Sequence, residues 1–208
     1  MRTGAAVRAA FTVCLAVLLL LCGAGTVSAA PSGYWYEHYN MSWLGDYTAT
    51  SSYSITCNED LAVLAVAVNN NTRLYNFTGK TVTVTNNSLD LSAHYWTPIG
   101  NTTENDPSTR IFQGTFDGSN HIISNMNVTK VVGSNNIYAG LFGSVKGATI
   151  KNVALTDVVV NVTTSNGNIH AGGLVGWANG SSITNCYATG NVSASGSCDT
   201  ALSGGLAG

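Results

Sequence analysis

The sequence predicts a mainly β protein built from stacked repeats, and three observations support this fold class. A glycine-rich phrase recurs at residues 139–143, 172–176 and 204–208, where it reads AGLFG, GGLVG and GGLAG. The last glycines of these phrases are 33 and then 32 residues apart, a step that is typical of solenoid folds. A second phrase, Ile-x-Asn, recurs between them, and segments from Lys80 onward alternate apolar and polar residues, as half-buried strands do.

Residues 1–29 are predicted to be a signal peptide. Arg2 and Arg8 are the only charged side chains before an apolar run at residues 9–22, and the segment ends in Val-Ser-Ala, which fits a small-x-small cleavage site. The run is shorter than the roughly 20 apolar residues of a membrane span, although an uncleaved membrane anchor stays open as the alternative. We therefore expect a secreted or cell-surface protein that begins at Ala30 and has no membrane span after cleavage.

The chain is poor in charge. Charged residues make up 9% of it, against roughly a quarter in an average protein, and the formal net charge is −2. No basic patch is present, which argues against nucleic acid as a partner. Because Asn, Ser, Thr and Gly supply the polarity, we expect a fold that depends on backbone hydrogen bonds and small polar side chains rather than on ion pairs.

Residues 30–55 form an aromatic, polar segment that predicts no regular element. Its aromatic rings could stack on sugars or anchor a partner, or they could plug the first coil of the solenoid. We adopt the plug as the interpretation. The aromatic cluster consists of Tyr34, Trp35, Tyr36, Tyr39 and Trp43.

One helix is predicted, over residues 57–69. Thr56 and Glu59 match a capping box, in which each side chain bonds the other residue's backbone N–H. An apolar stripe with helical spacing follows, and a run of three asparagines ends it. We expect this short helix to cap the first coil.

The rest of the chain divides into first strands and repeats. Residues 81–85 and 88–92 alternate apolar and polar side chains, which predicts two strands. We place the capping helix and these strands in residues 56–111, and the solenoid repeats in residues 112–208. Because the sequence ends inside its third glycine phrase, we expect an open strand edge on the last coil, which further repeats or a partner would cover.

The Ile-x-Asn phrase predicts two stacked columns. It starts at Ile123, Ile150 and Ile183, and equivalent residues of successive coils lie about 4.8 Å apart. The isoleucines would form one inward aliphatic column, and the asparagines would form an amide ladder in which each side chain bonds the next. The predicted ladder consists of Asn125, Asn152 and Asn185.

The recurring phrases carry a family resemblance. Residues 138–143 and 172–176, together with WTPIG at 96–100 and FQGTFDG at 112–118, resemble the GLUG-motif region of bacterial and archaeal surface or secreted proteins. The resemblance covers roughly residues 56–208 and implies a right-handed parallel β-helix on a large exported protein, often an adhesin. The motif has no established catalytic residue to transfer. The repeat glycines, expected at tight corners that a Cβ forbids, are Gly140, Gly143, Gly173, Gly176, Gly205 and Gly208.

No catalytic, metal or cofactor site is predicted, and we expect the protein not to be an enzyme. The carboxylates fall at scattered positions of the repeat, so they do not predict the convergent pair of a glycosidase. No HExxH, GxSxG or phosphate-loop motif occurs, and no Cys and His spacing suggests zinc. The carboxylates considered are Glu59, Asp60, Asp90, Glu104, Asp106, Asp117 and Asp157.

Two kinds of covalent modification are predicted. Cys186 and Cys198 are better candidates for a disulfide than Cys57, since they lie 12 residues apart across one repeat. Nine Asn-x-Ser/Thr triplets could accept glycans in an exported chain, or could arise by chance in a sequence so rich in Asn and Thr. They begin at Asn40, Asn70, Asn76, Asn86, Asn101, Asn127, Asn161, Asn179 and Asn191.

These observations favour a non-enzymatic module of the cell surface with a structural or adhesive role, whose partners would be surface glycans or proteins. The alternative is an accessory, non-catalytic region of a larger secreted peptidase or polysaccharide-acting enzyme, since similar repeats accompany IgA-cleaving metallopeptidases. A third and weaker reading, a polysaccharide-cleaving β-helix, requires a groove that gathers two carboxylates within about 10 Å.

Overall fold

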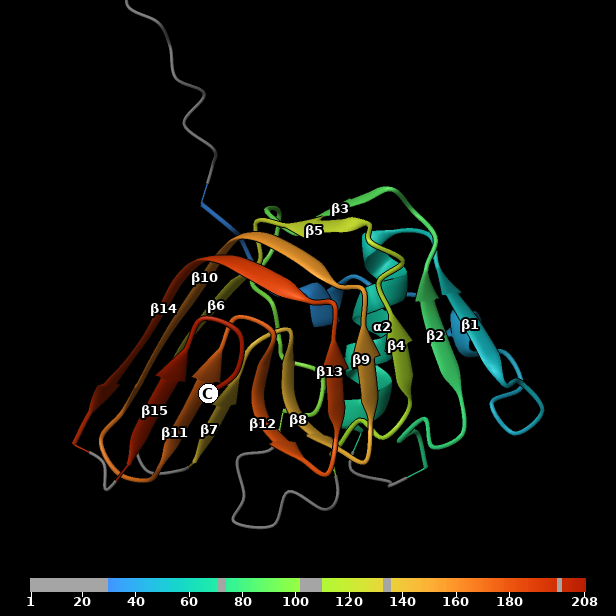
Figure 1. Cartoon of the computed structure of the whole chain (residues 1–208). Helices are drawn as coiled ribbons and strands as arrows, with labels where there is room; N and C mark the ends of the chain where they lie inside the picture. The colour runs from blue at the N-terminus through green and yellow to red at the C-terminus, as the bar shows by residue number, and fades with distance from the viewer. Residues whose placement is uncertain (1–29, 71–73, 102–109, 133–135, 198–199) are drawn as a thin grey trace, which may run out of the picture.

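The protein, seen in a computed structural model, is a parallel β-solenoid of about four turns, with one α-helix in the described part of the chain (Figure 1). The predicted fold class is therefore confirmed. The predicted signal peptide and Cys198 lie outside the described part of the chain. The structure describes residues 30–70, 74–101, 110–132, 136–197 and 200–208.

The N-terminal part holds the helical elements, and strands make up the rest. In chain order, the N-terminal elements are the 3-10 helices η1 (Trp35–Glu37) and η2 (Met41–Leu44), strand β1 (Ser52–Ile55) and helix α2 (Asn58–Asn69). The later strands are β2 (Thr81–Val84), β3 (Ser88–Asp90), β4 (Thr115–Asp117), β5 (Ile122–Ser124), β6 (Asn127–Val132), β7 (Ile137–Ala139), β8 (Phe142–Lys146), β9 (Thr149–Lys151), β10 (Ala154–Thr164), β11 (Ile169–Gly172), β12 (Val175–Asn179), β13 (Ser182–Thr184), β14 (Tyr187–Gly196) and β15 (Ala201–Gly204).

Equivalent strands of successive coils pair in parallel, and this builds four sheets along the solenoid. One sheet has the order β1-β2-β4-β9-β13, and a second has the order β14-β10-β5-β3 with β6 also paired to β10. The third and fourth are β15-β11-β7 and β12-β8. Figure 1 shows the strands of each sheet side by side, so that each face of a coil belongs to one sheet.

Alternating apolar residues fill the interior of the coils. In β2, Val82 and Val84 are fully buried, whereas the alternating Thr81 and Thr83 are only partly covered. Phenylalanine rings then continue from coil to coil: Phe112 lies 5.3 Å from Phe142 between ring centroids, and Phe116 lies 5.2 Å from Phe142. The core is therefore a continuous file of side chains along the axis rather than a single centre.

The predicted isoleucine column is only partly right. Ile150 and Ile183 pair directly in adjacent strands. Ile123 belongs to the neighbouring sheet, where it pairs with Leu155, and Phe116 takes the expected place beside Ile150. The prediction for Ile123 was wrong because Ile-x-Asn marks the end of a short strand before a corner, and a coil has more than one such corner.

Helix α2 agrees with the predicted helix except at its start. Cys57, not Thr56, is the N-cap residue, and its side chain makes no capping hydrogen bond. Thr56 instead donates its backbone N–H and its hydroxyl to the Asp60 carboxylate, at 2.8 and 2.7 Å. The predicted capping box with Glu59 was therefore wrong, because the carboxylate one residue further along satisfies Thr56.

The helix is embedded more deeply than a single apolar stripe predicts. Seven of its 12 residues are buried, and it packs against η1, η2 and β1. The amide of Asn58 donates to the backbone carbonyl of Asp90 at 2.8 Å, at the end of strand β3. Because β3 is the edge of its sheet, α2 covers the N-terminal end of the stack.

The last coil is less well covered. Strands β13, β14 and β15 lie at the edges of their sheets. Val192 and Ala194 of β14 are only partly buried, whereas their partners in β10, Val160 and Val162, are 1% and 0% exposed. Inward side chains of β14 therefore remain accessible among the described residues, which fits the expected open edge.

Candidate functional site

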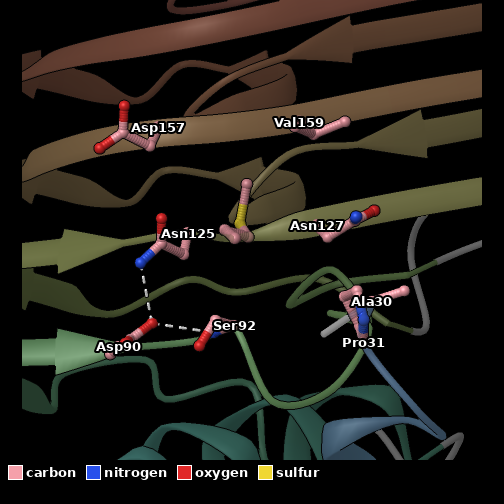
Figure 2. Close-up of a pocket in the computed structure, with 9 residues that line it drawn as sticks. Ala30, Pro31, Asp90, Ser92, Asn125, Asn127, Asp157 and Val159 are labelled. Carbon is pink, nitrogen blue, oxygen red and sulfur yellow. Dashed lines mark hydrogen bonds between the residues drawn. The ribbon is translucent and has the colours of Figure 1, made fainter. Parts of the chain in front are cut away.

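A pocket of about 360 Å³ opens on the face formed by β3, β5 and β10 (Figure 2). Its walls are mostly polar side chains from successive coils, and the N-terminal residues Ala30 and Pro31 close one end. We call it the carboxylate groove. Its polar side chains are Asp90, Ser92, Asn125, Asn127 and Asp157.

Three residues of the carboxylate groove lie at the same corner of neighbouring coils. Asp90 pairs with Ser124, which pairs with Thr156, so Asn125 and Asp157 occupy equivalent positions one residue further along than Asp90. Asn125 and Asp157 both have left-handed backbones, with φ of 57° and 54°. Asn and Asp adopt this conformation at a lower cost than other residues with a side chain. Figure 2 shows the resulting order Asp90, Asn125, Asp157.

Hydrogen bonds hold Asp90 at this corner. The Nδ2 group of Asn125 and the backbone N–H of Ser92 both donate to its Oδ1, each at 3.0 Å. The bond from Asn125 lowers the pKa of the Asp90 carboxyl most strongly; burial opposes the shift, and the bonds from Ser92 add to the lowering. Asp90 is therefore a hydrogen-bonded carboxylate that joins adjacent coils.

The polar side chains of the carboxylate groove are used differently from those of a glycoside-cleaving site. Asp90 and Asp157 lie two strand steps apart, about 10 Å between backbones at the usual strand spacing, at the upper end of the roughly 6.5–9.5 Å between the carboxyls of an inverting pair. Asn125 stands between them, where such an enzyme leaves room for water. The acid of the pair also needs a raised pKa, whereas that of Asp90 is lowered.

The sequence reasoning missed this arrangement, since it treated the carboxylates as scattered. A signal was present at Asn125 and Asp157, which are 32 residues apart, one repeat step. The substitution of Asp for Asn at one level hid the repetition from a search for identical residues.

A second ladder contains two of the three predicted asparagines. Asn185 donates to Oδ1 of Asn152 at 2.7 Å, and Asn152 donates to Oδ1 of Asp117 at 3.0 Å. Lys151 adds an ion pair to Asp117 at 3.1 Å. The prediction for Asn125 was wrong: it bonds Asp90 in the carboxylate groove. The acceptor for Asn152 is instead Asp117, which pairs with Lys151, one position before the asparagines of the ladder.

Burial alone raises the pKa of Asp117, but the hydrogen bonds from Asn152 and Ser119 and the bond and charge of Lys151 outweigh it. The net effect is a lowered pKa, so this carboxylate also stays ionised at neutral pH. Both aspartates of the two ladders therefore act as acceptors between coils.

The repeat glycines are needed mainly for close approach of neighbouring coils. A Cβ on Gly173 would lie 2.5 Å from the carbonyl oxygen of Gly205, and one on Gly143 would lie 2.7 Å from that of Gly100. Of the six repeat glycines only Gly140 has a positive φ, of 155°. The expected reason, a corner that forbids a Cβ, was therefore wrong for the other five. The other close contacts are those of Gly140, Gly176 and Gly208, which approach the backbone of Gly172, Ala139 and Ala171.

Cys186 is a free thiol among the described residues. Its predicted partner Cys198 lies outside them, so the disulfide stays a prediction. Cys186 follows the ladder residue Asn185 as Val153 follows Asn152, and its partly buried side chain packs against the core. Burial raises the pKa of the Cys186 thiol. An inward core position therefore accounts for Cys186 in the described part of the chain.

The aromatic cluster separates into two groups. Trp35 is 4% exposed and donates its indole N–H to the carbonyl of Leu91 at 3.2 Å, so it plugs the first coil. Trp43 packs against the core and donates to the carbonyl of Ser54 at 2.8 Å. The tyrosines do not share this role. Tyr34, Tyr36 and Tyr39 are 37%, 44% and 44% exposed.

The Asn residues of the nine triplets are all at least partly accessible. Three of them, Asn76, Asn101 and Asn127, are partly buried. The other six are exposed, namely Asn40, Asn70, Asn86, Asn161, Asn179 and Asn191. Glycosylation of these residues stays a prediction.

The described residues contain neither a metal-binding group of side chains nor a membrane-spanning helix. No group of three or more His, Cys, Asp or Glu side chains in them is arranged to hold a metal ion. None of the described helices has both the length and the apolar character that crossing a membrane requires.

The comparison with protein families matches residues 167–193 to the GLUG motif. The matched stretch runs from just before β11 into β14, which is close to one full coil. A search of the curated proteins and of the solved structures returned no match. The chain therefore contains a GLUG motif within its repeats, as the recurring phrases predicted.

Proposed function

We propose that this GLUG-motif solenoid is a non-enzymatic module of an exported protein, with a structural or adhesive role at the cell surface. The observation that carries the proposal is the use of the groove's polar side chains. Asp90 and Asn125, which a hydrolase would direct at substrate, bond one another and join coils. The polar residues of the second ladder do the same.

The architecture suits display more than catalysis. A solenoid whose coils contact only their neighbours is stiff along its axis and offers long open faces. Binding on such faces is spread over several coils. The apolar run at residues 9–22 and the low charge of the chain support export and a role outside the cell.

Export is tested with the full chain in the organism that encodes it. Intact cells are treated with a protease that does not enter them, and the chain is then detected with an antibody. We expect cleavage from outside in the wild type and protection in a Leu19→Arg variant, whose apolar run is interrupted. A wild-type chain found only in the cytoplasm would contradict the proposal.

The absence of catalysis is tested with the purified protein and soluble polysaccharides, by measuring new reducing ends. We expect none above the buffer control. Release of reducing ends by the wild type that disappears in Asp157→Asn would show that the carboxylate groove is an active site.

A further inference from the structure

Three exposed tyrosines lie beside each other on the N-terminal segment; we call Tyr34, Tyr36 and Tyr39 the tyrosine face. The rings of Tyr34 and Tyr36 are stacked, with centroids 5.1 Å apart and planes at 18°. Tyr34 also forms a β-bridge with Tyr95, whose ring centroid lies 5.7 Å away. The solenoid thus fixes this part of the face in place, so little conformational entropy would be lost when a ligand binds.

Two pockets adjoin the tyrosine face. One has a volume of about 360 Å³ and the other about 210 Å³, and both are bordered by Tyr36, Thr97 and Asn101. Because they share three residues, they are adjacent compartments of one hollow. The larger volume falls in the usual range for small-ligand sites, roughly 300–1,000 Å³.

Hydrogen bonds set the polar walls of this hollow. Asn69 accepts the backbone N–H of Asn101 at 2.6 Å and donates to the carbonyl of Pro98 at 2.9 Å. Lys130 donates its ammonium to Oδ1 of Asn101 at 3.1 Å. Burial, and then the charge of Arg110, lower the pKa of Lys130. The hollow therefore combines aromatic rings, side-chain amides and one partly desolvated amine.

We propose that the two pockets and the tyrosine face form a binding site for an oligosaccharide. Sugar rings would stack their apolar faces on both Tyr36 and Tyr39, because an aromatic ring offers apolar area with little entropy to lose. Hydroxyl groups would bond the amide of Asn101 and the amine of Lys130, which can each serve sugar oxygens. Two compartments about Tyr36 would hold neighbouring sugars of one chain.

The lining favours carbohydrate over a protein partner. The hollow has a mainly apolar surface, with tyrosine rings, Val66 and Pro98 in its lining, and amide, hydroxyl and ammonium groups are placed among them, as the two faces of a sugar require. A protein anchor buried in such a hollow would need a partner for each of these polar groups. A sugar supplies a hydroxyl for nearly every one. The inference deepens the proposed surface role and rests on it for its biological meaning.

The test uses the full-length protein, produced in a host without N-glycosylation so that Asn70 and Asn101 are unmodified. Isothermal titration calorimetry measures binding of cellohexaose, chitohexaose, mannohexaose, xylohexaose and hexagalacturonate. We expect at least one to bind, with affinity reduced tenfold or more in Tyr36→Ala and in Tyr39→Ala. The matched control is Tyr187→Ala, which removes a 51% exposed tyrosine on β14 and should leave the affinity unchanged. Unchanged circular dichroism spectra show that the variants fold.

Lys130→Gln separates two kinds of sugar. If the ligand is acidic, binding of hexagalacturonate falls strongly in this variant; if it is neutral, binding of the neutral hexaose falls no more than a few-fold. Both results support an oligosaccharide site.

Three results would overturn the inference. The first is the failure of every oligosaccharide to bind, and the second is an equal affinity in Tyr36→Ala and the wild type. The third comes from an assay of the protein's adhesion to cells: adhesion that survives periodate oxidation of the cell-surface sugars but is lost when the cells are treated with protease. The last result would assign the site to a protein partner. A protein that binds sugar in the calorimeter but stays in the cytoplasm would refute the surface role and leave the sugar site intact.

Discussion

Replacing Gly173 with alanine is expected to destabilise the solenoid, whereas the same change at Gly205, one coil later, is not. A Cβ on Gly173 would lie 2.5 Å from the carbonyl oxygen of Gly205 and 2.9 Å from Cβ of Ala188. Real Cβ atoms do not approach backbone so closely, so the next coil must move. Overpacking of this kind costs about 1–3 kcal/mol. Around Gly205 no atom lies within 4 Å of the added Cβ.

Gly205→Ala has the opposite expected sign. With no steric cost and no positive φ at this position, alanine restricts the unfolded chain and stabilises the protein by up to about 1 kcal/mol. The assay is thermal unfolding of both variants followed by circular dichroism. For a domain of this size 1 kcal/mol shifts Tm by roughly 2–4 °C. Gly173→Ala should therefore lower Tm by about 2–12 °C, and Gly205→Ala should leave it unchanged or raise it slightly. Equal losses at the two glycines would refute the close-approach argument.

Three further predictions concern the ladders and the thiol. Asn152→Gly removes two amide hydrogen bonds and should lower the free energy of unfolding in urea by about 1–3 kcal/mol. Asn152→Ala should lower it by about 1 kcal/mol more, because alanine disfavours the φ of 55° at this position. Equal losses in the two variants would contradict the argument from backbone strain. Folding lowers the pKa of the Asp90 and Asp117 carboxyls. Their ionised forms therefore stabilise the folded protein at pH values above the unfolded pKa of about 3.9. This stability should disappear as the pH falls through the folded pKa values. If the urea midpoint of an Asp90→Asn/Asp117→Asn double variant falls as steeply between pH 5 and 2 as that of the wild type, these two carboxylates are not the source of the pH dependence. Cys186→Val should keep Tm within a few degrees of the wild type, whereas the loss of a disulfide would cost about 2–5 kcal/mol.

The repeat and the strands were predictable because burial imposes a period on the residues. Val82 and Val84 alternate with threonine, and they are the residues that the structure buries. The glycine phrases recur at the coil step because two backbones meet at each of them. Such signals depend only on which side chain faces inward, and the sequence displays this directly.

Register at the corners was not predictable in the same way. Thr115 to Asp117 align with residues 34 positions later, whereas Ile122 to Ser124 align with residues 32 positions later. Two extra residues therefore separate the corners in one coil. Asn and Asp both tolerate the left-handed backbone that these corners use, so the sequence does not label which corner an asparagine occupies. Asn125 was assigned to the wrong ladder for this reason.

The aromatic segment was misread for a different reason. Trp35 and Tyr36 are neighbours in sequence, yet one is buried and the other is exposed. In a strand alternation would reveal this, but both residues belong to the 3-10 helix η1, which is too short to show a period. The separation into a plug and a tyrosine face depends on tertiary contacts with the first coils, which composition does not encode.

The location of the proposed sugar site follows from how the solenoid uses its polar residues. Within the repeats, side chains such as Asp90, Asn125 and Asn152 bond the next coil, so they are not free to turn toward a ligand without loss of stability. Ligand recognition is less constrained where the repeat is interrupted. Tyr36 on the N-terminal segment and Asn101 after the first strands have no counterpart in the stacked columns. A variant of these residues should therefore change binding with little change in Tm, whereas a ladder variant should do the reverse, and one set of melting and titration curves decides between the two assignments.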